Sequence, residues 1–356
     1  MKPSSALRVL MVGVSDPPPA FIARQVSVLE SLGVQVFRFP EFRKRKYIAN
    51  VLLYWGIFLH IPRQTRALFR EVDLVHFQWP GHLIAYYPLA KRANKPIVVS
   101  LRGRQINITP FAPGNARYVK DLRRILPLCD AYHCVSENIL LEAQNFGLEP
   151  KRAYVIRPAI DTSIFYPVGR SIPSRPARLL MIGALIWRKG YEYALLVMKR
   201  LVDAGVDAQL TIVGDGNECD RIQYTIQDLE LQDRVYLLGQ VNPSQVLELL
   251  HDSQVFLHTA LSEGIANVVL EAMACGLPVV SFSSGGIDEV IDHGKDGFLA
   301  KTRDVDDVTK YVIRIVTNPE LRHSLGAAAR QKIQSQFELK SQGQQFIDLY
   351  TSLIEK

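Results

Sequence analysis

Cysteine is scarce in this chain of 356 residues. The four cysteines form no C-x-x-C pair, and no histidines accompany them at the spacing of zinc ligands; they lie at positions 129, 134, 219 and 275. The sequence therefore predicts neither a disulfide scaffold nor a structural zinc site. A chain of this length exceeds one ordinary hydrophobic core and predicts two domains of roughly 150 to 180 residues each.

Long apolar runs are also missing. The longest, from Tyr47 to Ile61, is shorter than the roughly 20 residues needed to span a bilayer, and it contains Asn50, Gly56 and His60. The apolar run near the amino terminus is too short for the core of a secretory signal. We therefore expect a cytoplasmic protein without a transmembrane helix.

Two common nucleotide-binding loops are absent as well. The first predicted strand continues into GVSDPPPAF, and the later GDGNEC lacks the G-x-G-x-x-G spacing of a dinucleotide-binding loop. The phosphate-binding sequence G-x-x-x-x-G-K-[ST] does not occur. These absences argue against an NAD or FAD enzyme and against a P-loop nucleotide hydrolase, and we expect no cofactor.

Acidic residues are few in the first half of the chain. Residues 1–165 contain 23 lysines and arginines and 11 acidic residues, a balance of +12, whereas residues 166–356 contain 19 and 24, a balance of −5. Such asymmetry indicates that the first half meets an anionic surface or ligand, with nucleic acid, acidic lipid and a phosphorylated substrate as candidates. A solvated basic face is the alternative.

Short apolar runs alternate with helix-like segments along the whole chain. Runs such as RVLMVGV, VDLVHF and PIVVSL precede a stretch rich in proline, serine and arginine, after which RLLMIGAL, QLTIVGDG and LPVVSF continue the rhythm. This alternation is typical of parallel sheets with helices on both faces. We expect an α/β fold of two Rossmann-like doubly wound domains facing across a cleft, with residues 1–168 and 178–336 joined by a linker at 169–177.

The most informative segment is SEGIANVVLEAMACGLPVVSFSSGGIDEVI, residues 262–291. Its first part predicts a loop that opens a helix, and the exposed N–H groups and dipole of such a helix end favour a phosphate. Glu263 precedes this helix and Glu271 lies inside it. An ionised carboxylate accepts hydrogen bonds from vicinal hydroxyls, so sugar hydroxyls are the expected partners of the two glutamates.

The same segment resembles the donor-site signature of the retaining glycosyltransferase family 4, also known as glycosyl transferases group 1. The resemblance rests on E-G-x(6)-E, then A-M-A-x-G-x-P-V-V, then S-G-G-x-x-E-V-I, and extends to KGYEYAL, TIVGDGNECDRI, RVYLLGQV and AYHCVSENILLEAQNFG. It implies a GT-B type fold of two Rossmann-like domains and transfer of a sugar from a nucleoside diphosphate donor to an acceptor hydroxyl. It also implies a carboxyl-terminal helix, within residues 337–356, that returns to the first domain.

The resemblance assigns roles to individual residues. Glu263 is expected to bind the hydroxyls of the donor sugar, Glu271 to bind the ribose, and Lys189 to neutralise the leaving diphosphate. The backbone of the helix-opening loop is expected against the sugar and diphosphate; it comprises Gly264, Ile265, Ala266 and Asn267. The family commonly has an arginine where this chain has Ala184, and we expect Arg188 to supply that second charge.

The first domain departs from the family pattern at Arg102. The family often has T-x-H-G after a strand, whereas this chain reads SLRG, with Arg102 in the place of the histidine. An arginine does not act as a base near neutral pH, but it stabilises the negative charge of a phosphate or an acceptor. We therefore expect Arg102 in the active site.

A D-x-D sequence at Asp304-Val305-Asp306 matches the metal-diphosphate motif of another glycosyltransferase fold. It precedes the amphipathic run VTKYVIRIV, so a helix amino cap with an acidic first turn explains it better. We expect no metal site. The eight histidines are scattered and are interpreted as strand-end or core residues.

Basic residues adjoin the longest apolar run. Residues 43–46 read RKRK and lead directly into YIANVLLYWGIFLHIP, a pattern typical of an interfacial helix on an anionic membrane. We expect peripheral membrane association through residues 43–61, which would hold the enzyme near a lipid-linked acceptor. The alternative is a core helix with a solvated basic loop.

Two other function classes remain open. A glycoside hydrolase also uses two carboxylates, although it has no use for a phosphate-binding helix terminus or for Lys189. A nucleic-acid-binding protein fits the basic first half, yet no helix-turn-helix, RNA-recognition or zinc-finger sequence accompanies that charge, and we expect no nucleic-acid partner.

Overall fold

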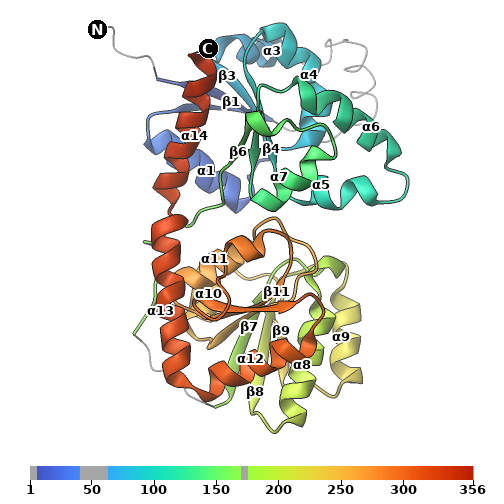
Figure 1. Ribbon diagram of the computed structural model, residues 1–356, viewed down its shortest axis with the longest axis vertical. Helices are drawn as coiled ribbons and strands as arrows, with labels where there is room; N and C mark the ends of the chain where they lie inside the picture. Colours follow the sequence, from blue (N-terminus) through green and yellow to red (C-terminus); the bar gives the residue numbers. More distant parts are fainter. Residues whose placement is uncertain (1–5, 41–62, 170–174, 356) are drawn as a thin grey trace. The chain divides into compact units, whose positions relative to one another are not determined.

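The structure is a computed structural model that describes residues 6–40, 63–169 and 175–355. Its elements group into two compact units. Unit 1 comprises residues 1–158 and 339–356, and unit 2 comprises residues 159–338. Each unit contains one six-stranded parallel sheet (Figure 1).

The sheet of unit 1 has the strand order β2-β1-β3-β4-β5-β6. Its strands are β1 (Arg8–Val14), β2 (Gln35–Pro40), β3 (Leu74–Phe77), β4 (Ile97–Leu101), β5 (Ala131–Cys134) and β6 (Ala153–Val155). Its helices are α1 (Ala20–Ser31), α3 (Arg63–Glu71), α4 (Pro80–Ala93), α5 (Arg104–Asn107), α6 (Ala116–Ile125), α7 (Glu137–Gln144) and α14 (Leu339–Ile354), with short 3₁₀ turns at Thr109–Phe111, Leu126–Leu128 and Pro150–Arg152. The last helix, α14, packs against α1 (Figure 1).

The sheet of unit 2 has the order β12-β11-β10-β7-β8-β9. Its strands are β7 (Ala177–Ile182), β8 (Ala208–Val213), β9 (Val235–Leu237), β10 (Val255–His258), β11 (Val279–Ser283) and β12 (Gly297–Lys301). Its helices are α8 (Tyr191–Asp203), α9 (Cys219–Asp228), α10 (Pro243–His251), α11 (Asn267–Ala274), α12 (Val305–Thr317) and α13 (Pro319–Gln336), with 3₁₀ turns η5 (Trp187–Lys189) and η6 (Gly285–Glu289).

Both sheets are covered on both faces. In β1 every residue from Val9 to Val14 is buried, as expected for a strand without a solvent face. Alternate side chains of each strand enter different apolar clusters, so each unit has one core on either side of its sheet. The predicted α/β class with two doubly wound sheets is thus confirmed.

In each sheet, the direction in which successive strands are added changes at one point, the strand reversal. The reversal lies between β1 and β3 in unit 1 and between β7 and β10 in unit 2. Ligands of open α/β sheets bind at the carboxyl ends of the strands, at such reversals. The segments that follow these four strands are therefore the places where functional side chains are expected.

Residues 159–168, which the sequence places in the first domain, pack in unit 2 instead. The backbone N–H of Ile160 donates to the carbonyl of Phe337 at 2.9 Å, and Arg330 of α13 donates to the carbonyls of Thr162 and Phe165. These hydrogen bonds tie the segment to the end of α13, and a sequence pattern does not reveal such distant partners.

No helix within the described ranges combines the length and apolar character needed to cross a bilayer. The predicted membrane-binding segment at 43–61 lies outside the described residues.

Candidate functional site

The turn that carries Lys189 is fixed by its neighbours in unit 2. Gly190 has φ +64°, and a Cβ there would lie 2.2 Å from the carbonyl oxygen of Thr259, so the turn passes against the end of β10 as only glycine allows. The Thr259 hydroxyl donates to the Gly190 carbonyl at 2.8 Å. The Leu261 N–H donates to the Arg188 carbonyl at 2.8 Å. These contacts join the segment after β7 to the segment after β10.

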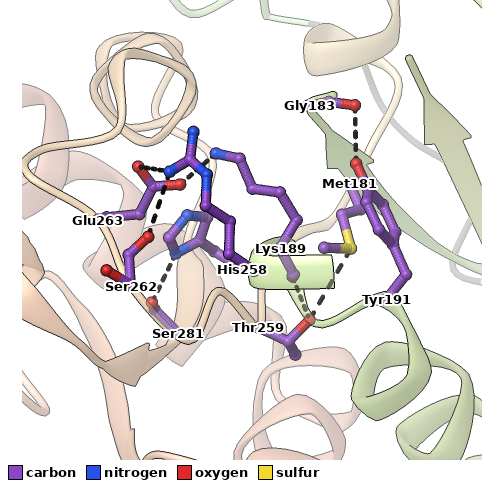
Figure 2. Close-up of polar contacts among 10 residues, drawn as sticks. Met181, Gly183, Lys189, Tyr191, His258, Thr259, Ser262, Glu263 and Ser281 are labelled. Atoms are coloured by element: carbon purple, nitrogen blue, oxygen red, sulfur yellow. Dashed lines mark hydrogen bonds and ion pairs between the residues drawn. The ribbon is translucent and has the colours of Figure 1, made fainter. Parts of the chain in front are cut away.

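This junction brings Lys189, Arg188 and Glu263 together. The Lys189 amine donates to Oε1 of Glu263 (Figure 2), and Nη1 of Arg188 lies 3.6 Å from Oε2 of the same carboxylate. Glu263 is only 7% exposed. One carboxylate held by two cations leaves a local charge of +1 at the strand reversal, which suits an anionic ligand.

The charges of the cluster set its protonation states. Burial alone would raise the pKa of Glu263, but Lys189, His258 and Arg188 together hold it below its usual range. Burial, aided by Lys189, lowers the pKa of His258 to about 4, although Glu263 acts in the opposite direction. Near neutral pH, Glu263 is therefore ionised and His258 is neutral.

The S-G-G sequence packs against the backbone of the Glu263 loop. A Cβ at Gly285 would lie 1.9 Å from the carbonyl oxygen of Glu263, and one at Gly286 would lie 1.8 Å from that of Gly264. Gly285 also has φ +62°. Both glycines are thus required because the segment after β11 presses on the segment after β10. This contact is the physical reason for the motif that the sequence singles out.

Helix α11 begins at Asn267, three residues after Gly264. Its amino cap, Ala266, makes no side-chain capping bond, and the first turn contains no acidic residue. Such an end favours an anion through its N–H groups and its dipole. Gly264, Ile265 and Ala266 are buried, whereas Asn267 is half-buried. Glu271 lies in the second turn of α11 and is nearly buried.

Several buried polar atoms around this loop have no hydrogen-bond partner in the part of the chain that the structure describes. They are Nε of Arg188, Nε2 of His258, Oδ1 of Asn267 and Oγ of Ser284. Both donors and acceptors occur among them, and orphaned polar atoms are rare in folded proteins. A ligand rich in hydroxyl and phosphate groups satisfies such a mixed set, so these atoms fit a nucleotide sugar.

Sequence reasoning missed two members of this group. His258 was interpreted as a strand-end or core residue; it does end β10, and its Nδ1 lies 2.9 Å from Oγ of Ser281, yet its other nitrogen faces the cluster (Figure 2). Ser284 directly precedes the two glycines, and their motif could have drawn attention to it. No sequence signal separates His258 from the other histidines.

Arg102 lies in unit 1, directly after β4. Its Nη2 donates to the side-chain oxygen of Gln78 at 2.7 Å and to that of Gln25 at 2.9 Å. Its guanidinium carbon lies 5.1 Å from the ring centre of Phe21 and 6.0 Å from that of Trp79. Arg102 therefore lies beside the strand reversal of its own sheet, where it contacts Gln78 after β3 and is surrounded by neutral groups.

The D-x-D sequence is a helix cap, as the sequence predicts. The Asp304 side chain accepts from the N–H of Asp307 at the start of α12, and Asp306 pairs with Arg200. Within residues 6–40, 63–169 and 175–355, no group of three or more histidine, cysteine or acidic residues is arranged to hold a metal ion.

A cavity of about 580 Å³ in unit 2 is remote from this chemistry. Its lining includes Ser253 and Gln254, which precede β10, and Leu277 and Pro278, which precede β11. It therefore lies at the amino ends of these strands, the opposite edge of the sheet from Glu263. Its position excludes it from the candidate site.

Two family models match the chain without overlap. The model described as Glycosyltransferase Family 4 matches residues 8–164, and the model described as Glycosyl transferases group 1 matches residues 166–332.

Curated relatives match most of the chain at low identity. N-acetyl-alpha-D-glucosaminyl L-malate synthase of Bacillus anthracis is 28% identical over 291 residues, which is 79% of this chain and 74% of the relative. A GDP-mannose-dependent monoacylated alpha-(1-6)-phosphatidylinositol monomannoside mannosyltransferase of Corynebacterium glutamicum is 26% identical over 304 residues, 80% of this chain and 77% of the relative.

Solved structures share the fold. Sucrose-phosphate synthase from Thermosynechococcus elongatus superposes with a TM-score of 0.81 at 20% identity, covering 98% of this chain and 99% of the other. Anabaena HepE in complex with UDP gives a TM-score of 0.78 at 17% identity, covering 98% and 100%.

Proposed function

We propose that the chain, which belongs to the family 4 glycosyltransferases, transfers a sugar from a nucleoside diphosphate donor with retention of anomeric configuration. The part of the chain that matches glycosyl transferases group 1 forms most of unit 2. One relative, from Erwinia amylovora, is named for amylovoran biosynthesis, and the relative from Corynebacterium glutamicum is named for the mannosylation of a phosphatidylinositol monomannoside; we place the acceptor among polysaccharides and glycolipids.

The observation that carries this proposal is the cluster of Glu263, Lys189 and Arg188 beside the uncapped end of α11. The two cations and the helix end meet the diphosphate, and Glu263 accepts hydrogen bonds from the sugar hydroxyls. A hydrolase that acts through a carboxylate pair needs neither cation, and in it the two cations on Glu263 would oppose protonation of a general acid.

The remaining residues of the loop complete the donor site. The backbone of Gly264, Ile265, Ala266 and Asn267 lies against the sugar and the diphosphate, and Glu271 accepts hydrogen bonds from the ribose. HepE, which shares this fold, has been crystallised with UDP, and the mannosyltransferase relative is named for GDP-mannose. We infer that the donor of this chain is likewise a nucleoside diphosphate sugar.

The proposed reaction breaks the bond between the anomeric carbon and the leaving phosphate oxygen, through a transition state with oxocarbenium character. The acceptor oxygen bonds to the same face of the sugar, and its proton passes to the departing phosphate. Lys189 and Arg188 stabilise the charge that develops on the diphosphate. Neither residue needs to give up a proton in this scheme.

Thermal unfolding with a panel of nucleotide sugars tests the donor site. A matching donor should raise the melting temperature of the wild type, and the rise should shrink in Lys189→Gln but persist in Lys199→Gln, which changes an exposed lysine of α8. A panel with no effect on the wild type would contradict the assignment.

Release of the nucleoside diphosphate tests the reaction class. Release that depends on the acceptor supports transfer, whereas equal release in water alone supports a hydrolase. The anomeric configuration of the product, read by NMR, decides between retention and inversion.

We further propose reversible membrane association through residues 43–61, based on their sequence alone. Four basic residues near an anionic surface contribute roughly 4 kcal/mol, which is enough for reversible binding. Co-sedimentation with liposomes should require anionic lipid and weaken with salt. Equal binding to neutral liposomes, or none, would contradict this part while leaving the transferase proposal standing.

A further inference from the structure

Arg102 is a cation that has no counter-ion in the part of the chain that the structure describes. No carboxylate among the described residues contributes to its electrostatic environment, and its hydrogen-bond acceptors are the neutral side chains of Gln25, Gln78 and Ser100. Burial lowers the pKa of Arg102 to about 10, although the residue keeps part of its surface exposed. A desolvated charge is costly unless an opposite charge meets it, so the surroundings of Arg102 are suited to an external anion.

Unused hydrogen-bond donors accompany this charge. Nε of Arg102 and Nε2 of Gln78 are buried and have no hydrogen-bond partner within the described ranges, and Gln78 has no exposed surface. The orientation of the Gln78 amide follows from its neighbour, since a guanidinium only donates and the amide oxygen must face it. The amide N–H₂ is therefore left for an acceptor atom. Donors and a positive charge at one place select an oxyanion.

The position of the pair agrees with a ligand site. Gln78 follows β3, and Arg102 follows β4, at the carboxyl edge of the unit 1 sheet and beside its strand reversal. The rings of Phe21 and Trp79 pack about the guanidinium and fix its orientation. A side chain held in this way presents its remaining N–H groups in a defined direction.

We propose that Arg102 and Gln78 bind an anionic group, a phosphate or a carboxylate, that is carried by the acceptor. This inference rests on the proposed function, in which the donor diphosphate is held by Lys189, Arg188 and α11 in unit 2. The acceptor is then an acidic molecule, such as a phosphorylated lipid carrier or an acidic sugar, and Arg102 selects it over neutral alcohols.

The first test uses inorganic phosphate and acetate as probes of the full-length chain. At constant ionic strength, with chloride as reference, a tenfold excess over the dissociation constant should raise the melting temperature by about 2–4 °C. Arg102→Gln should lose this rise. Arg104→Gln, which changes an exposed arginine two residues away, should keep it. A wild type that responds to neither anion, or an Arg102→Gln variant that still responds, would overturn the proposal.

A second variant, Gln78→Glu, tests the proposal even if Arg102→Gln does not fold. Gln78→Glu places a carboxylate at the position that now lies 2.7 Å from the guanidinium, and so supplies an internal counter-ion. It should melt at a higher temperature than the wild type in chloride and should show no further rise with phosphate or acetate. A Gln78→Glu variant that responds to the anions as the wild type does would also overturn the proposal.

A third measurement distinguishes an anionic group of the acceptor from the diphosphate of the donor. The affinities of UDP, GDP and ADP should change by less than about threefold in Arg102→Gln. A loss of tenfold or more would assign the anion to the donor diphosphate and overturn the acceptor proposal. Absence of any nucleoside diphosphate binding to the wild type would instead contradict the proposed function, while the phosphate response would still report on Arg102.

Discussion

The two sheets end in differently built positive sites. In unit 2 the strand reversal carries a carboxylate, Glu263, held by two cations, whereas in unit 1 it carries a cation, Arg102, held by neutral amides and a hydroxyl. Both sites lie after the carboxyl ends of strands in similar parallel sheets. The sheet thus decides where these polar side chains lie, and the segments after its strands decide whether a positive charge is balanced in part by a carboxylate or only by neutral groups.

Beneath Arg102, unit 1 contains a chain of buried hydrogen bonds that is longer than the one in unit 2, where His258 pairs with Ser281 and Ser281 donates to the Phe282 carbonyl. The distances are 2.7 Å from Tyr350 to His76, 2.8 Å from His76 to Ser100, 2.7 Å from Ser100 to His133, and 2.9 Å from His133 to the Ile156 carbonyl. The carbonyl only accepts, so Nε2 of His133 carries its proton, and each earlier group then donates to the next. Both histidines are neutral in this arrangement.

The largest expected effect is the response of unit 1 to acid. Burial lowers the pKa of His133 to about 3, with Arg102 adding to the effect, and burial holds that of His76 well below its usual value. Because both folded pKa values lie below about 6.5, the unfolded chain takes up protons first as the pH falls, and stability is lost below that pH. The two rings together should lower the free energy of unfolding by on the order of 4 kcal/mol between pH 6.5 and 5.

Hydrogen exchange in each unit measures this difference. After correction for intrinsic exchange rates, amides of β4 and β5 should lose more protection between pH 7.5 and 5 than amides of β10 and β11. In the described part of unit 2, His258 is the one buried histidine. His133→Gln should halve the response of unit 1, and His323→Gln, at an exposed position, should leave it unchanged. Equal responses of the two units would break the comparison.

The next effect concerns the carboxylate of unit 2. Glu263→Gln keeps the shape of the side chain but removes the charge that faces Lys189 and that, in the proposed function, meets the donor hydroxyls. Turnover should fall by at least about 10²-fold if Glu263 acts in the transition state. Steady-state kinetics measures this loss, with Glu248→Gln, an exposed glutamate of α10, as the control. Near-normal turnover in a folded Glu263→Gln variant would remove Glu263 from the site.

Much of the fold and of the unit 2 cluster follows from sequence. Alternating apolar runs predict the strands, and the family resemblance of the motif assigns Glu263, Lys189 and Arg188 to one site. Lys189 and Arg188 do reach Glu263, because Gly190 permits the close approach of the two loops. Local patterns succeed here because the contacts lie between loops at one strand reversal, where the topology already brings them together.

The surroundings of Arg102 were beyond sequence reasoning. Its partners Gln25 and Gln78 lie far from it in the chain and carry no motif, and the network beneath it is completed by Tyr350, which the carboxyl-terminal helix α14 supplies. Nothing in the residues near Arg102 indicates that its neighbours are all neutral. The absence of a counter-ion among the described residues is a property of the packed structure, and it supports the role in stabilising negative charge that the sequence already suggests for Arg102.

A smaller loss of stability is expected when the buried hydrogen-bond network of unit 1 loses its first donor, the Tyr350 hydroxyl. Tyr350→Phe removes the hydroxyl that donates to Nδ1 of His76 and leaves a buried acceptor unsatisfied. The free energy of unfolding should fall by about 1–3 kcal/mol. Urea denaturation measures the change. Tyr154→Phe provides the control, because its hydroxyl lies 3.4 Å from Ser352 in a partly exposed setting and should contribute less than about 0.5 kcal/mol. Equal losses in the two variants would argue against a special role for the network.

The smallest expected effect is that of a chelator, which tests whether the two cations of unit 2 suffice without a metal ion. If the diphosphate is neutralised in unit 2 by Lys189, Arg188 and the end of α11, no divalent ion is needed to balance its charge. The one metal-like sequence is already engaged, since Asp304 caps α12 and Asp306 pairs with Arg200. Dialysis against EDTA should therefore change activity by less than about twofold. Activity that vanishes, and that magnesium or manganese restores, would mean that the two cations do not suffice and that an ion shares the charge of the diphosphate.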